Sequence, residues 1–302
     1  MKIISLLPAT TEIVCALDLR EQLVGRSHEC DYPEYVQTLP VCSQPKYPFD
    51  GQSFDIDQKV KAILSEGLSI YRINTDQIRQ LNPNLILTQD QCEVCAVALK
   101  DVEQCLAQIG VEASVLSFSP ETLEDILADI QVIAGQFKIP EKGLQLKNEI
   151  DQGFSVIRNK TSTLEPVHME IIEWIDPLMA AGNWMPDLVE IAGGYCTLGE
   201  SGEHSPFIDF EQLMKADPEI LSIIPCGYPI QRTKSELDTL FKTERWQELK
   251  AVKNKRIYIA DGHQFFNRPG PRIANSARIL AEIMHPDIFK PEQKQNCWTE
   301  VY

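Results

Sequence analysis

Apolar residues follow two patterns that alternate along most of the chain. Short, mainly apolar runs, such as residues 3–7 and 85–88, predict buried strands, and residues 256–260 alternate as a strand does. Longer segments with apolar residues three or four positions apart predict helices. Strands separated by helices of about 10–15 residues are typical of βαβ units. The pattern therefore predicts an α/β protein with mainly parallel sheets.

The alternation stops once, between residues 119 and 160. Ser119-Pro120-Glu121 has the composition of a helix start, and the pattern stays helical to about Lys160 apart from an interruption at Lys138-Ile139-Pro140. About 40 residues of helix are too long for an ordinary crossover. We therefore predict two α/β lobes, residues 1–118 and 161–302, connected by helix over residues 119–160.

Composition limits the kinds of ligand. The chain has 302 residues, of which 43% are hydrophobic and 24% are charged, as in soluble globular proteins. Its formal net charge of −16 argues against nucleic acid, because binding to phosphates needs a basic surface. Cationic ligands, metals and neutral ligands all stay open.

The first residues indicate a strand. The apolar run that starts at Ile3 ends at Pro8 and is shorter than the ~7–15 apolar residues of a secretory signal. No stretch approaches the ~20 apolar residues of a membrane helix. We therefore expect a cytoplasmic protein without membrane insertion.

The segment 261–272 is the strongest candidate for ligand contact. It lies between a predicted strand and a predicted helix, where parallel sheets place their ligands. Its prolines and glycine restrict the loop, so binding would order little additional chain. The alternative is a proline-rich connection whose aromatic side chains cover the core. The predicted ligand-binding residues of this loop are His263, Phe265, Phe266, Asn267 and Arg268.

Two segments of the first predicted lobe carry soft metal ligands. Cys92 and Cys95 follow a strand at the predicted start of a helix, where a thiol pKa is lowered. His28 and Cys30 follow another strand. If these loops converge, they supply nitrogen and sulfur ligands for zinc or iron, or for the cobalt of a corrinoid. Ordinary packing of the thiols and a redox pair are the alternatives.

Other candidate ligand-binding residues also follow predicted strands. Trp174 ends a strand of the second lobe, and Asn183 and Trp184 precede a helix there. Trp184 either presents its indole face to a flat ligand or packs in the core. In the first lobe the candidates are Pro8, Ala9, Thr10, Thr11, Glu29, Gln89 and Asp90.

Several motifs together resemble the vitamin B12 and iron-siderophore substrate-binding proteins of ABC importers. The motifs span residues 5–12, 24–33, 81–86, 181–183, 189–194 and 216–220. The resemblance implies two Rossmann-like α/β lobes, a rigid backbone helix, and a ligand held between the lobes. It is nearer still to a subgroup called cobalamin-binding proteins, which carry Ser-His-Glu-Cys-Asp, Cys-Glu-Val-Cys-Ala and Phe-Asn-Arg-Pro-Gly-Pro-Arg.

The resemblance also implies a ligand and a partner. The ligand is cobalamin or a related corrinoid, although Glu29 stands where the B12 importer protein has an aromatic residue. Asp76 and Glu211 match the acidic residues that dock to arginines of the membrane permease. Both are equally compatible with solvated acids at helix starts.

The sequence contains none of the familiar catalytic motifs that would support an enzyme. The sequence has no nucleophile elbow, phosphate loop, dinucleotide glycine pattern or His-Glu-x-x-His helix. We therefore expect a binding protein for a corrinoid or another metal chelate. The competing hypothesis is a cytosolic metal-binding protein or metal-dependent enzyme that uses the Cys/His loops.

Overall fold

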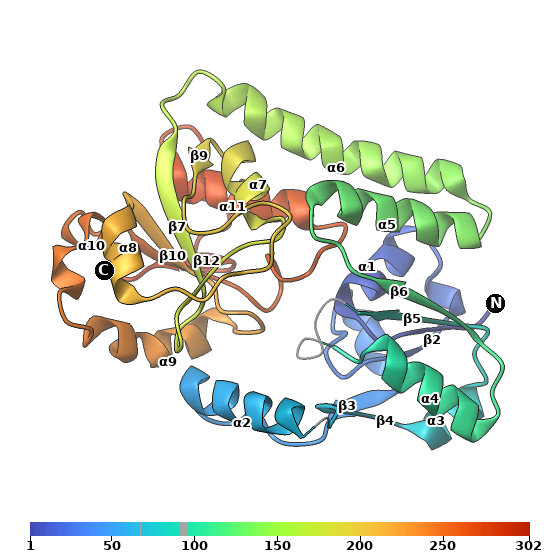
Figure 1. The fold of residues 1–302 in the computed structure, drawn as a ribbon. Helices are drawn as coiled ribbons and strands as arrows, with labels where there is room; N and C mark the ends of the chain where they lie inside the picture. The colour runs from blue at the N-terminus through green and yellow to red at the C-terminus, as the bar shows by residue number, and fades with distance from the viewer. Residues whose placement is uncertain (67, 91–95) are drawn as a thin grey trace. The chain divides into compact units, whose positions relative to one another are not determined.

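The fold was obtained as a computed structural model, which describes residues 1–66, 68–90 and 96–302 (Figure 1). The chain divides into two compact units. The first lobe contains residues 1–50, 58–120 and 125–147, and the second contains residues 51–57, 121–124 and 148–302. Cys92 and Cys95 lie outside the described residues.

A parallel sheet forms the centre of the first lobe. Its strands follow the order β2-β1-β5-β6, and all neighbouring pairs are parallel. The central strands are buried along their whole length because helices follow them in the chain and cover them. A separate antiparallel pair, β3 and β4, accompanies this sheet. The elements are β1 (Ile3–Ser5), α1 (Pro8–Ala16), η1 (Arg20–Gln22), β2 (Leu23–Arg26), η2 (Glu34–Thr38), β3 (Ser43–Pro45), α2 (Ser53–Ser65), β4 (Tyr71–Ile73), α3 (Thr75–Leu81), β5 (Leu85–Gln89), α4 (Leu99–Ile109) and β6 (Ser114–Phe118).

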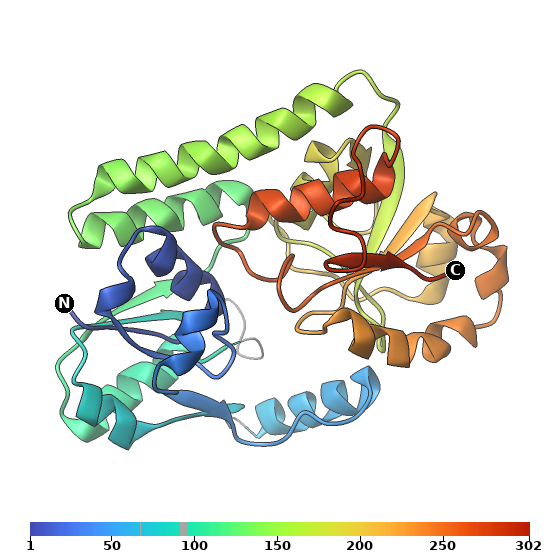
Figure 2. The same cartoon turned by 180° about the vertical axis from the view of Figure 1, so that it is seen from behind.

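Two helices connect the sheets. α5 (Leu123–Gln136) and α6 (Pro140–Thr161) are separated at Lys138, which has a left-handed φ of 56°. Figures 1 and 2 show α5 beside the first half of α6. The interruption predicted at residues 138–140 is therefore a turn of a helical hairpin, and the long helix that links the lobes is α6.

The second lobe is built on a mixed sheet with the order β12-β11-β10-β7-β8. β7, β10 and β11 are parallel, whereas β8 and β12 pair antiparallel at the two edges. A short strand, β9, also pairs with β7. The elements are β7 (Val167–Trp174), β8 (Met179–Ala180), α7 (Met185–Ile191), β9 (Gly194–Tyr195), α8 (Phe210–Ala216), β10 (Ile220–Ile223), α9 (Ile230–Phe241), η3 (Trp246–Glu248), α10 (Lys250–Lys253), β11 (Ile257–Ala260), α11 (Ile273–Met284) and β12 (Trp298–Glu300).

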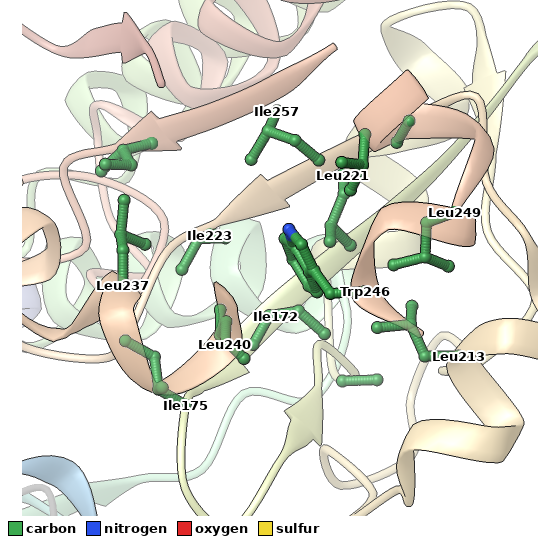
Figure 3. Packing of buried hydrophobic residues seen from close by; sticks show 14 of the residues in the cluster. Ile172, Ile175, Leu213, Leu221, Ile223, Leu237, Leu240, Trp246, Leu249 and Ile257 are labelled. Carbon is green, nitrogen blue, oxygen red and sulfur yellow. The ribbon is translucent and has the colours of Figure 1, made fainter. Parts of the chain in front are cut away.

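Trp246 lies at the centre of the second lobe's apolar core (Figure 3). It is 1% exposed and is surrounded by side chains from β7, β10, β11, α8 and α9. Phe241 packs against it with ring centroids 5.8 Å apart. These contacts attach α8, α9 and η3 to one face of the sheet, so the strand ends beside them are held in place.

The predicted fold is confirmed: two α/β lobes carry parallel strands, and a long helix links them. Two helix starts were predicted too early. The helix expected from Ser119 begins at Leu123, and the one expected from about Glu93 begins at Leu99, after the extended residue Ala98. Ala98 instead forms a bridge with Gln89 at the end of β5.

Candidate functional site

In the first lobe, the loops after β1, β2 and β5 carry the predicted site residues. Because these strands are parallel, their carboxyl ends lie at one edge of the sheet, where ligands of α/β proteins bind. Pro8 opens α1, and a proline at the first helical position removes an amide that would have no helical partner. Pro8, Ala9, Thr10 and Thr11 are all buried.

Cys30 lies inside a network of hydroxyl groups beneath these loops. Its sulfur is 3.1 Å from Thr11 Oγ1 and 3.1 Å from Ser27 Oγ, and it is completely buried. Ser5 Oγ is 2.8 Å from the hydroxyls of both Thr10 and Thr11. The network holds the β1–α1 loop against the β2 loop. Cys30 thus occupies a packed position, and its predicted role as a metal ligand stays a prediction.

His28 is the more accessible donor of the β2 loop. Its side chain is 25% exposed, and its Nδ1 lies 3.4 Å from Ser43 Oγ. Burial lowers the pKa of His28 to about 4, and the nearby charge of Arg26 acts in the same direction. The imidazole is therefore neutral near pH 7, which is the form that coordinates a metal.

This pKa makes a stability prediction. Because the folded pKa of about 4 is below the ordinary 6.5, the unfolded chain binds the proton more tightly. Stability is complete above pH 6.5 and falls as the pH approaches 4. Between pH 7.5 and 4.5 we expect the wild type to lose roughly 1–3 kcal/mol more than His28→Gln in urea unfolding. Equal losses in the two proteins would show that His28 titrates normally.

The remaining first-lobe candidates differ in exposure. Gln89 is buried, and its Nε2 donates to the Ala96 carbonyl at 3.2 Å. Asp90 is exposed, and its amide donates to the Phe118 carbonyl at 3.3 Å. Glu29 Oε1 lies 3.8 Å from His28 Nε2. Among the residues that the structure describes, no three His, Cys, Asp or Glu side chains are grouped as for a metal ion.

In the second lobe, aromatic side chains gather at the ends of β7 and β10. Trp174 ends β7, and its indole N–H donates to the Asp176 carbonyl at 3.1 Å. Tyr228, in the loop after β10, meets the Trp174 ring edge to face with centroids 5.3 Å apart. Tyr228 is not among the residues that the sequence predicted for the site. Its partner Trp174 is more than 50 residues away in the sequence, and no local pattern indicates the contact.

Two backbone hydrogen bonds of Gly262 join the loops after β10 and β11. The Gly227 amide donates to the Gly262 carbonyl at 3.2 Å, and the Gly262 amide donates to the Tyr228 carbonyl at 3.0 Å. A Cβ at Gly262 would lie 2.1 Å from the Pro225 carbonyl oxygen. Only glycine fits this approach, so residue 262 fixes the spacing of the two loops.

The predicted loop after β11 is ordered by its own polar groups. Asp261 Oδ1 accepts the amides of His263 and Gln264 at 2.8 and 2.7 Å, which is a turn typical of aspartate. Asn267 Nδ2 donates to the Gly262 carbonyl at 3.1 Å. Arg268 is 7% exposed, and its Nη2 lies 3.3 Å from His263 Nε2. Such a loop is preorganised for contact with a ligand.

Aromatic residues of this loop point in different directions. Phe265 is partly exposed, and the Arg272 guanidinium lies over its ring at 5.0 Å. Phe266 is completely buried and has a left-handed φ of 49°. Trp184 is 6% exposed, and its indole N–H donates to the Phe266 carbonyl at 2.8 Å. In this structure Trp184 therefore packs in the core, which was the alternative to a ligand contact. Together with Phe266 it supports the buried side of the loop.

Asn183 is held by the glycine-rich segment 199–206. The Asn183 backbone N–H donates to the Glu203 carbonyl at 2.6 Å, and the Gly202 backbone N–H donates to the Asn183 backbone carbonyl at 3.1 Å. Ser205 Oγ donates to a Glu173 carboxylate oxygen at 2.8 Å. Asn183 is half-buried and has a left-handed φ of 49°, which asparagine tolerates better than most residues. These hydrogen bonds order the segment 199–206, although its glycine-rich composition alone would predict a mobile loop.

The sequence matches the periplasmic binding protein family over residues 3–263, which is most of the chain. The chain belongs to the periplasmic binding protein family.

Curated relatives match over more than four fifths of their own length. The vitamin B12-binding protein of Vibrio parahaemolyticus is 24% identical over 285 residues, which cover 93% of this chain and 88% of that protein. An uncharacterised ABC transporter substrate-binding lipoprotein of Bacillus subtilis is 22% identical over 298 residues, covering 96% and 81% of the two chains.

Solved structures of periplasmic binding proteins share the fold. The periplasmic vitamin B12-binding protein of Vibrio cholerae superimposes with a TM-score of 0.65 at 21% identity, covering 94% of this chain and 96% of that one. A periplasmic heme-binding protein from Pseudomonas aeruginosa gives a TM-score of 0.69 at 17% identity, with 95% and 93% covered. At such identities the likeness establishes the fold alone.

The two acids matched to permease docking are on the surface of this binding-protein fold. Asp76 lies in the first turn of α3 and pairs with Arg79 at 3.0 Å, with its side chain 90% exposed. Glu211 lies in the first turn of α8 and pairs with Arg245 at 2.9 Å, with its side chain 73% exposed. Each acid thus has an arginine partner on its own lobe, and their docking role stays a prediction.

Proposed function

We propose that this protein binds a corrinoid, or a similar metal-chelate ligand, through strand-end loops of both lobes. The observation that carries the proposal is the family match over residues 3–263, which includes the loops after β1, β2, β5, β7 and β10. Relatives named for vitamin B12 and for heme support a large, flat, metal-containing ligand.

The chemistry of the loops fits such a ligand. Trp174 and Phe265 are partly exposed and offer aromatic area in the second lobe, and the buried Tyr228 ring packs against Trp174. Asn267 and His263 offer polar atoms in the same lobe. His28 is a neutral imidazole in the first lobe and is the proposed axial or contact residue for the metal centre. Cys92 and Cys95 are proposed to act with it.

The substrate-binding relative from Bacillus subtilis makes the permease of an ABC transporter the alternative partner, which the protein would have to reach from outside the membrane. Asp76 and Glu211 would have to exchange Arg79 and Arg245 for arginines of that partner. Within the described part of the chain, no helix is long and apolar enough to cross a membrane. We propose a cytoplasmic location, which fractionation of cells expressing the tagged full chain would test.

The decisive experiment is a titration of the purified protein with cyanocobalamin, cobinamide and hemin. Binding is followed by the absorbance bands of each ligand and by calorimetry, and the metal content of the protein is measured before ligand is added. We expect a dissociation constant well below millimolar for one of the three. No binding below about millimolar, together with stoichiometric zinc or iron, would support the competing hypothesis of a metal-binding protein or metal-dependent enzyme.

Single substitutions test the site. His28→Ala, Cys92→Ala and Cys95→Ala should each weaken binding by tenfold or more, which corresponds to only ~1.4 kcal/mol. Cys105→Ala is the matched control, because Cys105 is a buried thiol of α4 outside the proposed site. Unchanged affinity in all three site variants, with folding intact, would show that these residues only pack.

A further inference from the structure

Residues 46–70 leave the first lobe's β3 and return at β4; of these, residue 67 lies outside the described residues. The base of this segment is closed within the first lobe. β3 and β4 pair antiparallel, with Ser43 opposite Ile73 and Pro45 opposite Tyr71. The Lys46 amide extends the pairing by donating to the Ile70 carbonyl at 2.9 Å.

The tip of the segment belongs to the second lobe, in which residues 51–57 are grouped. The Ser53 amide, at the start of α2, donates to a Glu236 carboxylate oxygen of α9 at 2.8 Å. Both residues are buried, at 2% and 4% exposure. A carboxylate at a helix N-terminus satisfies a free amide and interacts favourably with the helix dipole. Glu236 is therefore an anchor for α2.

Arg232, one turn before Glu236 on α9, makes a second contact with the tip. Its Nη2 donates to the Gly51 carbonyl at 3.3 Å and to the Tyr228 hydroxyl at 3.1 Å. Its guanidinium lies 3.9 Å from the centre of the Tyr228 ring, and its Nε is 4.0 Å from Glu236. The same side chains therefore hold the tip of the segment and the ring of Tyr228, which faces Trp174.

The base of the segment meets the other candidate site residue. The His28 ring lies 5.5 Å from the Tyr71 ring and its Nδ1 lies 3.4 Å from Ser43 Oγ. The strands that flank the segment thus contact His28 through Ser43 and Tyr71. At the other end, Arg232 contacts both the tip and Tyr228.

We propose that residues 46–70 form a strap, anchored at its tip by Glu236 and Arg232, that is coupled to ligand binding. A ligand that orders Trp174 also orders the Tyr228 ring packed against it and Arg232, which holds the tip, so the anchor becomes stronger when the ligand is bound. By linkage, releasing the anchor lowers the affinity for the ligand by the factor by which the ligand strengthens the anchor. The coupling to ligand rests on the proposed function, whereas the anchor itself does not.

Hydrogen exchange of the tip, followed by mass spectrometry on the full chain, tests the anchor without any ligand. In Ser53→Pro the amide that Glu236 accepts is removed, while proline at a first helical position leaves the helix intact. Ser53→Ala keeps the amide and is the matched control. We expect peptides covering residues 46–57 to exchange at least tenfold faster in Ser53→Pro than in Ser53→Ala, with the sheets unchanged. Equal exchange in the two variants overturns the anchor.

Glu236→Ala provides a second route to the same result. It removes the acceptor, and Asp238→Asn is its control because Asp238 is on the same helix with its side chain 81% exposed. Faster exchange at the tip only in Glu236→Ala supports the strap. Retained protection in a folded Glu236→Ala argues against it.

The ligand arm uses whichever of cyanocobalamin, cobinamide and hemin binds the wild type. The strap predicts that the bound probe slows hydrogen exchange of residues 46–57. It also predicts that Ser53→Pro binds the probe more weakly than the wild type, by the factor by which the probe slows this exchange. Equal affinity in both proteins, with unchanged exchange, overturns the coupling. If all three probes fail to bind, the proposed function falls, and the exchange comparison alone decides for or against the anchor.

Discussion

Replacing Gly262 by alanine is expected to destabilise the second lobe by about 2–4 kcal/mol and to weaken ligand binding. The new Cβ would lie 2.1 Å from the Pro225 carbonyl oxygen, so the loops after β10 and β11 must separate. Separation weakens the two backbone hydrogen bonds that join the loops, which costs about 0.5 kcal/mol each, and overpacking adds about 1–3 kcal/mol. Urea unfolding followed by circular dichroism measures the change.

Gly135→Ala is the control for this substitution. Gly135 lies in α5, and an added Cβ there meets no atom within 4 Å. Alanine should stabilise that helix by up to about 1 kcal/mol. A Gly262→Ala protein that unfolds within about 0.5 kcal/mol of the wild type would refute the steric argument, because an ordinary surface substitution has effects of that size.

Truncating Trp246 to alanine should cost more, about 3–5 kcal/mol, because it empties the centre of the second lobe's core. Trp246→Phe separates volume from polarity. The Trp246 indole nitrogen is buried without a hydrogen-bond partner among the described residues, so phenylalanine removes no bond. We expect Trp246→Phe to lose less than half of the alanine effect. Equal losses for the two variants would mean that the indole nitrogen contributes to the fold.

Local pattern was sufficient for most of the fold. β10 was predicted from a mainly apolar run and β11 from an alternating pattern, and both strands are buried along their whole length, as is usual for parallel strands covered on both faces. The capping box of α8 was visible in the sequence because Asp209 and Gln212 are three residues apart. Helix starts were less certain, and Ala98 shows why: its extended conformation is stabilised by pairing with Gln89, which no helical signal can report.

The candidate site was predicted only in part. Strand ends located the loops, but not the direction of each side chain within them. Trp184 and Trp174 both lie near strand ends. The Trp184 indole is buried and donates to the Phe266 carbonyl, whereas Trp174 is partly exposed. Glu236 is a stronger example. Its bond to Ser53 spans 183 residues, and a glutamate in the middle of a polar helix gives no sign of it.

The different placement of the tryptophans has an optical consequence. Trp184, Trp246 and Trp298 are at most 6% exposed, whereas Trp174 is partly accessible beside Tyr228. A small neutral quencher such as acrylamide should therefore reach one emitter among the four. The accessible fraction of the intrinsic fluorescence then reports on a single ring, and a colourless compound that shields Trp174 becomes detectable without any label.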